Sequence, residues 1–195
     1  MENIYTLRGK VLEQMDDDEF FHFCQENSNL KFERDSKGQI IIMSPTAMIS
    51  GDRNSEIITQ LRIWNKKYNL GRAVDSNTGF YLKNTAMRNP DAAWISNEQY
   101  AKLSEKEIKK SFAYLCPSFI VELKSYSDSI EELKLKMNEW MENGCRLVWL
   151  IDVDEETVYI YEENKPSRVL QGFDQVLSGE PVLKGFEFVL SELRL

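Results

Sequence analysis

The fold is decided by residues 118–152, which have the sequence SFIVELKSYSDSIEELKLKMNEWMENGCRLVWLID. Residues 118–123 form an otherwise apolar strand that the charged residues Glu122 and Lys124 close, a pattern typical of a buried strand. Ser, Asp and Ser at 127–129 offer N-caps for a helix over 130–143, which a glycine terminates. Residues 146–152 are a second apolar strand. Strand, helix and strand in this order predict a right-handed parallel crossover.

The flanking segments supply further strands and helices, with one turn clearly marked. Ser36-Lys37-Gly38 separates two short strands and predicts a hairpin. Helices are expected over residues 15–27, 51–70 and 97–110, and strands over 29–33, 39–43, 72–75, 79–82, 90–95 and 157–161. In the second helix, Ile57, Leu61, Trp64 and Tyr68 repeat at helical spacing and Gly71 is expected to end it. The sequence therefore predicts an α/β domain, a mixed sheet with helices packed against it.

Length and composition indicate one ordinary globular domain over residues 1–195. Hydrophobic residues make up 42% and charged residues 29% of the chain, and there is no repeat or flexible linker. No apolar run approaches the roughly 20 residues that span a bilayer. Residues 1–10 lack the basic and apolar regions of a signal peptide, so a cytoplasmic location is expected.

Several classes of site are disfavoured by the rarity of histidine and cysteine. The single histidine, His22, lies among phenylalanines in a helical stretch, where a structural or surface role is the simpler interpretation. Cys24, Cys116 and Cys145 are widely separated, and no two have metal-ligand spacing. Reduced, buried thiols are therefore expected, and any catalysis must depend on carboxylates and lysines.

The net charge of −8 argues against tight, non-specific binding of nucleic acid. It does not exclude nucleic acid as a substrate. A carboxylate-rich site lowers the net charge, and a divalent cation bound there reverses the sign of the local charge.

Glu122 and Lys124 place charge at the end of a strand where burial is expected. Residues two apart on a strand share a face, so an acid and a base project side by side while Leu123 points the other way. Burying such charges requires mutual contact, water or a metal. The spacing itself is common, since Asp35–Lys37 is one of four further copies in the chain. Only the copy at Glu122 ends an apolar strand.

Asp91 is a second acid at the edge of an expected strand. Pro90-Asp91 leads into Ala-Ala-Trp-Ile and lies 31 residues before Glu122. If the two strands are neighbours, their carboxylates converge and could bind Mg²⁺, which prefers oxygen ligands and retains waters. A turn proline followed by a capping aspartate explains the same pattern equally well.

Seven short motifs occur along the chain in an order that resembles one known family. They are Ser44-Pro45-Thr46, Asp75-Ser76-Asn77-Thr78-Gly79-Phe80, Pro90-Asp91-Ala92-Ala93-Trp94, Val121-Glu122-Leu123-Lys124-Ser125, Lys136-Met137-Asn138-Glu139-Trp140, Asn143-Gly144 and Val148-Trp149-Leu150-Ile151-Asp152. Together they resemble the Uma-two family of restriction-endonuclease-like proteins in the PD-(D/E)XK nuclease superfamily. The resemblance extends over residues 15–190.

This resemblance implies a restriction-endonuclease-like fold and metal-dependent hydrolysis of phosphodiester bonds, with DNA as the expected substrate. Asp91 and Glu122 match the family's acidic ligands for Mg²⁺ or Mn²⁺, and the backbone carbonyl of Leu123 corresponds to a further ligand. Lys124 stands at the superfamily's usual position for the catalytic lysine. Many family members instead keep a lysine in the next helix, at Lys136. Lys124 is the first choice here because its strand position requires no reach.

Weaker candidates and two alternatives remain open. The superfamily often carries an acid on its first core helix, and Glu56 is the residue available there, although it lies away from the apolar stripe and is more simply explained as exposed helix surface. Asp75 could line the cleft, but turn capping explains it equally well. Ser125 could support the site through a hydrogen bond. The alternative function is a catalytically silent nuclease fold that acts as a binding or regulatory module, which the acidic net charge favours. A homodimer is a further alternative, because related nucleases often pair to cut both strands.

Overall fold

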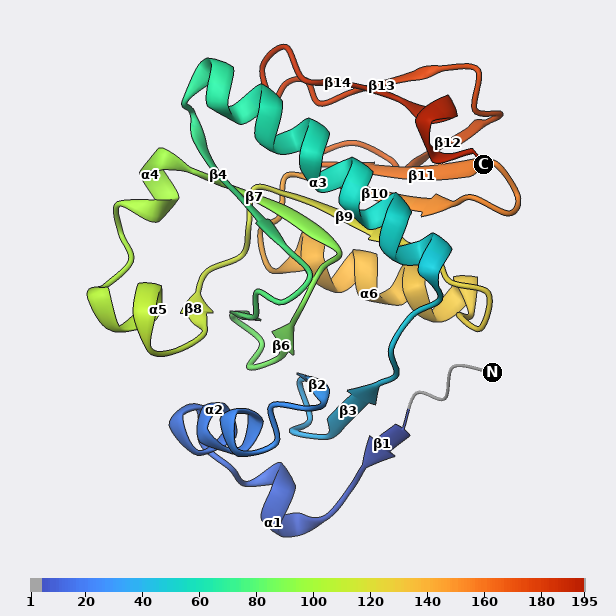
Figure 1. Cartoon of the computed structure of the whole chain (residues 1–195). Coiled ribbons are helices and arrows are strands. Elements are labelled where there is room, and N and C mark those ends of the chain that lie inside the picture. The colour runs from blue at the N-terminus through green and yellow to red at the C-terminus, as the bar shows by residue number, and fades with distance from the viewer. Residues whose placement is uncertain (1–4, 195) are drawn as a thin grey trace.

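The predicted crossover forms around three elements at the centre of the chain. Strand β9 (Phe119–Leu123), helix α6 (Ile130–Glu142) and strand β10 (Leu147–Asp152) follow one another, and the two strands pair in parallel. Ser129 caps the helix, with its side chain accepting from the backbone N–H of Glu132. The computed structural model describes residues 5–194 (Figure 1), so part of the N-terminal segment considered above, residues 1–4, lies outside it, as does residue 195.

A mixed six-stranded sheet is built around this pair. Its order is β12-β11-β10-β9-β7-β4, and all pairings except β9 with β10 are antiparallel. The other four strands are β4 (Gly71–Asp75), β7 (Ala92–Ser96), β11 (Thr157–Glu162) and β12 (Arg168–Gln171). The predicted α/β class and mixed sheet are therefore confirmed.

A second six-stranded sheet gathers the N-terminal strands, which the sequence did not separate from the first. Its order is β1-β3-β2-β6-β5-β8. The strands are β1 (Tyr5–Leu7), β2 (Lys31–Arg34), β3 (Ile40–Met43), β5 (Phe80–Tyr81), β6 (Met87–Arg88) and β8 (Ala113–Tyr114). Strands β2 and β3 form the hairpin predicted from Ser36-Lys37-Gly38. In Figure 1 this second sheet, called the N-terminal sheet below, lies beneath the sheet built around β9 and β10, called the larger sheet below.

The remaining elements cover the edges and ends of the two sheets. They are α1 (Lys10–Glu13), α2 (Asp17–Glu26), α3 (Met48–Tyr68), α4 (Asn97–Tyr100), α5 (Glu105–Lys109), the 3-10 helix η1 (Leu190–Leu193) and the two-stranded ribbon of β13 (Val176–Ser178) with β14 (Glu187–Val189). None of the helices in the described range combines the length and apolar character that a membrane span requires.

Three local predictions need correction. The helix expected over 97–110 is two short helices, because Ser96 and Ser104 each begin a new capping box. Helix α3 ends before Gly71, at a left-handed Asn69 with φ 52°. Gly71 instead opens β4, where a Cβ atom would lie 2.1 Å from the carbonyl oxygen of Ile95.

The larger sheet is covered on its two faces by α3 and α6, and the strand residues alternate between them. Phe119 and Val121 belong to the core that includes α3, whereas Ile120 belongs to the core that includes α6. From α3, Ile57, Leu61 and Trp64 are buried as predicted, but Tyr68 is 41% exposed. This alternation, a consequence of the two-residue period of a strand, determines which side chains of β9 can meet α6.

Leu61→Ala should lower the free energy of unfolding by about 2–4 kcal/mol, because it removes a fully buried side chain and leaves a cavity. Ile63 lies on the same helix and is 59% exposed, so Ile63→Ala is a matched control. The control should cost less than about 0.5 kcal/mol. Urea denaturation measures both values, and equal losses would contradict the assigned core face of α3.

Candidate active site

Glu122 is buried on the face of the larger sheet that α6 covers. It shares the parity of Ile120 along β9, and its residue is only 5% exposed. The run of apolar residues before it forces this burial, because the strand is covered on both faces. A charged group in such a position needs compensating partners.

Asp91 lies beside Glu122, as the sequence predicted under the condition that their strands are neighbours. Strands β7 and β9 pair antiparallel with Ala92 opposite Val121, which places Asp91 opposite Glu122 one residue further along. The Oδ2 atom of Asp91 accepts a hydrogen bond from the backbone N–H of Leu123 at 2.8 Å. Its Oδ1 atom accepts from the side-chain amide of Asn54, on α3, at 3.2 Å. Asp91 is thus held in place by two different elements.

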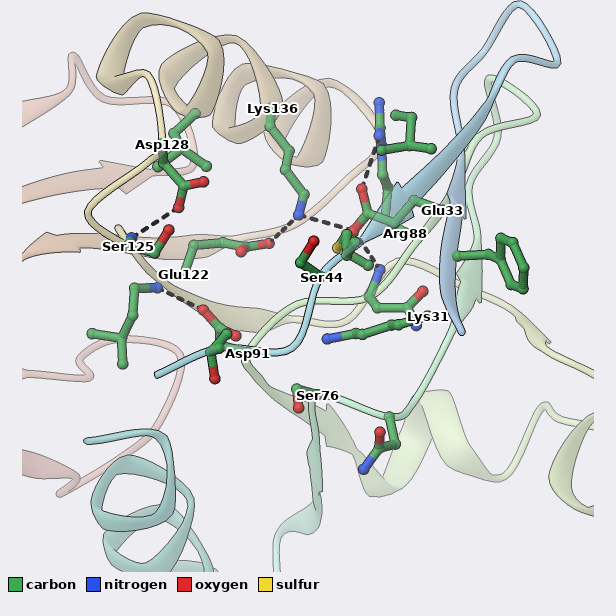
Figure 2. A pocket seen from close by; sticks show the side chains of 18 of the residues that line it. Lys31, Glu33, Ser44, Ser76, Arg88, Asp91, Glu122, Ser125, Asp128 and Lys136 are labelled. Atoms are coloured by element: carbon green, nitrogen blue, oxygen red, sulfur yellow. Dashed lines mark hydrogen bonds and ion pairs between the residues drawn. The ribbon is translucent and has the colours of Figure 1, made fainter. Parts of the chain in front are cut away.

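Lys136 reaches from α6 to Glu122, and Figure 2 shows its side chain between two carboxylates. The Nζ atom lies 2.8 Å from Oε1 of Glu122 and 2.9 Å from Oε1 of Glu33. Lys124 makes a different contact: its Nζ atom pairs with Oδ2 of Asp152, at the end of β10, at 3.2 Å. Of the two lysines considered from the sequence, Lys136 is therefore the one in contact with the Glu122 carboxylate.

Glu33, Arg88 and Glu139 extend this cluster and were not singled out from the sequence. Arg88 connects the two acids, with Nη1 3.0 Å from Oε2 of Glu33 and Nε 2.6 Å from Oε2 of Glu139. Glu33 is 3% exposed and also accepts from the backbone N–H of Asn89. The only sequence signal was an acid within a short hairpin strand, which does not indicate burial.

The cluster lies in a cleft of about 1210 Å³, which Ser125, Lys124 and Asp128 also line. The lesser candidates have local roles. Ser125 donates its backbone N–H to Asp128. Asp75 is exposed and accepts from the backbone N–H of Asn77, which is the turn-capping role. Glu56 accepts from the side chain of Gln60 on its own helix.

Comparison with protein families identifies the group to which this chain is related. Residues 17–192 match the model of the Uma2 family, described as "Putative restriction endonuclease". The chain belongs to the Uma2 family. Membership confirms the resemblance drawn from the motifs and supports a nuclease-like function.

A solved structure shares the fold. It is the crystal structure of "a putative nuclease belonging to DUF820" from Anabaena variabilis, with a TM-score of 0.70 and 18% sequence identity. The match covers 83% of this chain and 88% of that one. At this identity the similarity concerns the fold alone. Comparison with curated proteins gave no match.

The protonation of the acidic cluster is governed by burial and by the neighbouring charges of Lys136 and Arg88. Burial, opposed by Lys136 and reinforced by Asp91, raises the pKa of Glu122 to about 7. Burial also raises the pKa of Asp91, although the hydrogen bond from Leu123 opposes it. Burial would raise the pKa of Glu33 as well, but Lys136 and Arg88 outweigh it and hold that pKa at about 2. Burial lowers the pKa of Lys136, but Glu122 and Glu33 outweigh it, so the net shift is upward.

The donor set at Asp91 and Glu122 fits a hard divalent cation. Two adjacent carboxylates with raised pKa values lack sufficient positive charge, which a divalent cation would supply. Among residues 5–194, no group of three or more His, Cys, Asp or Glu side chains could hold a metal. Two carboxylates with a backbone carbonyl and waters are nevertheless a usual environment for Mg²⁺.

Stability should depend on pH through Glu122. Its pKa is higher in the folded protein than the ordinary 4.5, so the folded state binds a proton more tightly between about pH 4.5 and 7. Stability is therefore lost as the pH rises through this window. Relative to Glu122→Gln, the metal-free wild type should lose about 1–3 kcal/mol of unfolding free energy between pH 5 and pH 8.

Denaturation of both proteins at several pH values measures this difference. Glu132→Gln removes an exposed acid of α6 and provides the control, which should track the wild type. A difference between wild type and Glu122→Gln that stays constant with pH would contradict the raised pKa.

Proposed function

We propose that this chain is a metal-dependent nuclease that hydrolyses phosphodiester bonds, with DNA as its substrate. The observation that carries the proposal is the pairing in one cleft of the half-buried Asp91 with the buried Glu122, with the ammonium group of Lys136 2.8 Å from Glu122. Membership of the Uma2 family, described as a restriction endonuclease family, supports both the reaction class and the choice of DNA.

In this proposal Asp91, Glu122 and the carbonyl of Leu123 hold Mg²⁺ or Mn²⁺. The bound cation supplies Lewis acidity and lowers the pKa of a coordinated water. Asn54 and the backbone N–H of Leu123 orient the Asp91 carboxylate, so its geometry is set before a ligand arrives. Lys136 holds a fixed positive charge beside the acids, where it can stabilise negative charge that develops on a phosphate oxygen.

Lys136 is proposed as the principal catalytic lysine because of its contact with Glu122. Lys124 lines the same cleft, but its Nζ atom pairs with Asp152 at the end of β10. This reverses the order of preference drawn from strand position alone. The reversal depends on a helix–strand contact that strand periodicity cannot predict.

The alternative is a catalytically silent binding or regulatory module. The net charge of −8 favours it, as does the pairing of three cations that line the cleft, Lys124, Lys136 and Arg88, with carboxylates. Calorimetry with Mn²⁺ separates the two functions, because binding that disappears in Asp91→Asn supports the nuclease. A homodimer and a cytoplasmic location remain predictions from the sequence.

Asp91→Asn and Glu122→Gln should each reduce metal-dependent cleavage at least about a hundredfold, because each removes a charged ligand of the cation. Cleavage of plasmid DNA, single-stranded DNA and RNA with Mg²⁺ or Mn²⁺ provides the measurement and also identifies the substrate. Asp154→Asn changes an exposed acid and should cleave like wild type. Undiminished cleavage by both site variants would refute the proposed nuclease site.

Lys136→Met should lower kcat about a hundredfold, whereas Lys124→Met should lower it less than about tenfold. The difference follows from the contact of Lys136 with Glu122 and of Lys124 with Asp152. Single-turnover cleavage rates measure both effects. A larger loss in Lys124→Met would return the catalytic role to the strand lysine.

A further inference from the structure

Glu33 is the second carboxylate that holds Lys136, and it comes from the N-terminal sheet. The Nζ atom of Lys136 is 2.9 Å from Glu33 and 2.8 Å from Glu122, so the ammonium group bridges the two acids. All three side chains are largely buried, with exposed fractions of 16% for Lys136, 4% for Glu33 and 7% for Glu122. Figure 2 shows this bridge between the two sheets.

A cation at Asp91 and Glu122 would change the balance of this bridge. The charge of Glu122 would then be shared with the divalent ion, and the ion would repel the nearby ammonium group. If Glu122 were the only partner of Lys136, the ion pair that holds the lysine would weaken when the cation binds, which is the state in which the lysine must lie beside the metal site. A lysine also held by Glu33 retains a full negative charge within hydrogen-bond distance.

We infer that Glu33 is a positioning residue that keeps Lys136 beside the metal site when a divalent cation occupies Asp91 and Glu122. This inference rests on the proposed function, because it assigns Lys136 a role next to a metal. It concerns a residue outside the acid pair and the lysine candidates considered so far.

Glu33 is itself rigidly held, which suits it to this role. Its Oε2 atom pairs with Arg88 at 3.0 Å, and its Oε1 atom accepts from the backbone N–H of Asn89 at 3.0 Å. Arg88 in turn pairs with Glu139, which lies one turn beyond Lys136 on α6. Helix α6 therefore contacts the Glu33–Arg88 pair at two points, and the position of Glu33 relative to Lys136 is fixed from both sides.

These contacts also argue against Glu33 as a ligand of the cation. Both of its oxygen atoms already interact with Lys136, Arg88 or the amide of Asn89. Recruiting it to a metal would leave the buried guanidinium group of Arg88 with one carboxylate partner fewer, which is costly.

The test is the accessibility of Lys136 to acylation by acetic anhydride, quantified by mass spectrometry of the peptide that contains it. Lys102, whose side chain is 70% exposed, serves as the internal reference. Wild type, Glu33→Gln and Glu122→Gln are compared with and without Mn²⁺, and Glu132→Gln is the matched control. Circular dichroism and thermal melts show that each variant is folded under the labelling conditions.

Without metal, Lys136 should stay protected in Glu122→Gln, within about twofold of wild type, because Glu33 still holds it. With Mn²⁺, Lys136 should stay protected in wild type but become about tenfold more reactive in Glu33→Gln. If Glu33 only stabilised the fold, Glu33→Gln would not make the acylation of Lys136 depend on Mn²⁺. Equal exposure of Lys136 by Mn²⁺ in wild type and Glu33→Gln would overturn the inference.

Two further outcomes remain decisive. If Glu33→Gln does not fold, Glu122→Gln decides alone: tenfold exposure of Lys136 in that variant would show that Glu33 does not hold the lysine. If calorimetry of wild type gives no heat of Mn²⁺ binding, the proposed nuclease site fails and the inference fails with it. If Mn²⁺ binds but exposes Lys136 equally in wild type and Glu33→Gln, the inference alone fails, so the two failures are distinguishable.

Discussion

The carboxylate of Glu122 is buried at the end of a central strand, and the other features of the site compensate for that burial. An isolated carboxylate in such a place is strongly destabilised. Here Lys136 approaches from α6, yet burial and the neighbouring Asp91 still raise the pKa of Glu122 to about 7. The fold thus maintains a site that is short of positive charge, which is a suitable state for binding a divalent cation.

The N-terminal sheet completes this arrangement. Without Glu33 and Arg88, the side of α6 that carries Lys136 and Glu139 would have no charged partners from that sheet. The contacts of Glu33 and Arg88 join the N-terminal sheet to α6, the helix that covers one face of the larger sheet. The cleft therefore has one wall from each sheet, with the ion-pair network between them. Stability and function depend on the same buried charges, so substitutions there must be tested for both.

The burial of Glu122 could be predicted from strand periodicity, whereas its convergence with Asp91 required neighbouring strands, a condition that the residues left open and the pairing of β7 with β9 meets. The apolar run before Glu122 indicated burial, and Pro90 marked the start of the strand next to Asp91. The choice between Lys124 and Lys136 could not be predicted, since it depends on how α6 packs across the sheet. Glu33 could not be predicted either: its hairpin is short, and its burial arises from contact with a helix about a hundred residues later.

The most direct test of this account is the position of Mn²⁺ in a crystal of the wild-type protein, located by anomalous diffraction. We expect a peak within coordination distance of Asp91, Glu122 and the carbonyl of Leu123, with Lys136 still in contact with Glu33. A peak elsewhere, or no peak in crystals that contain millimolar Mn²⁺, would contradict it.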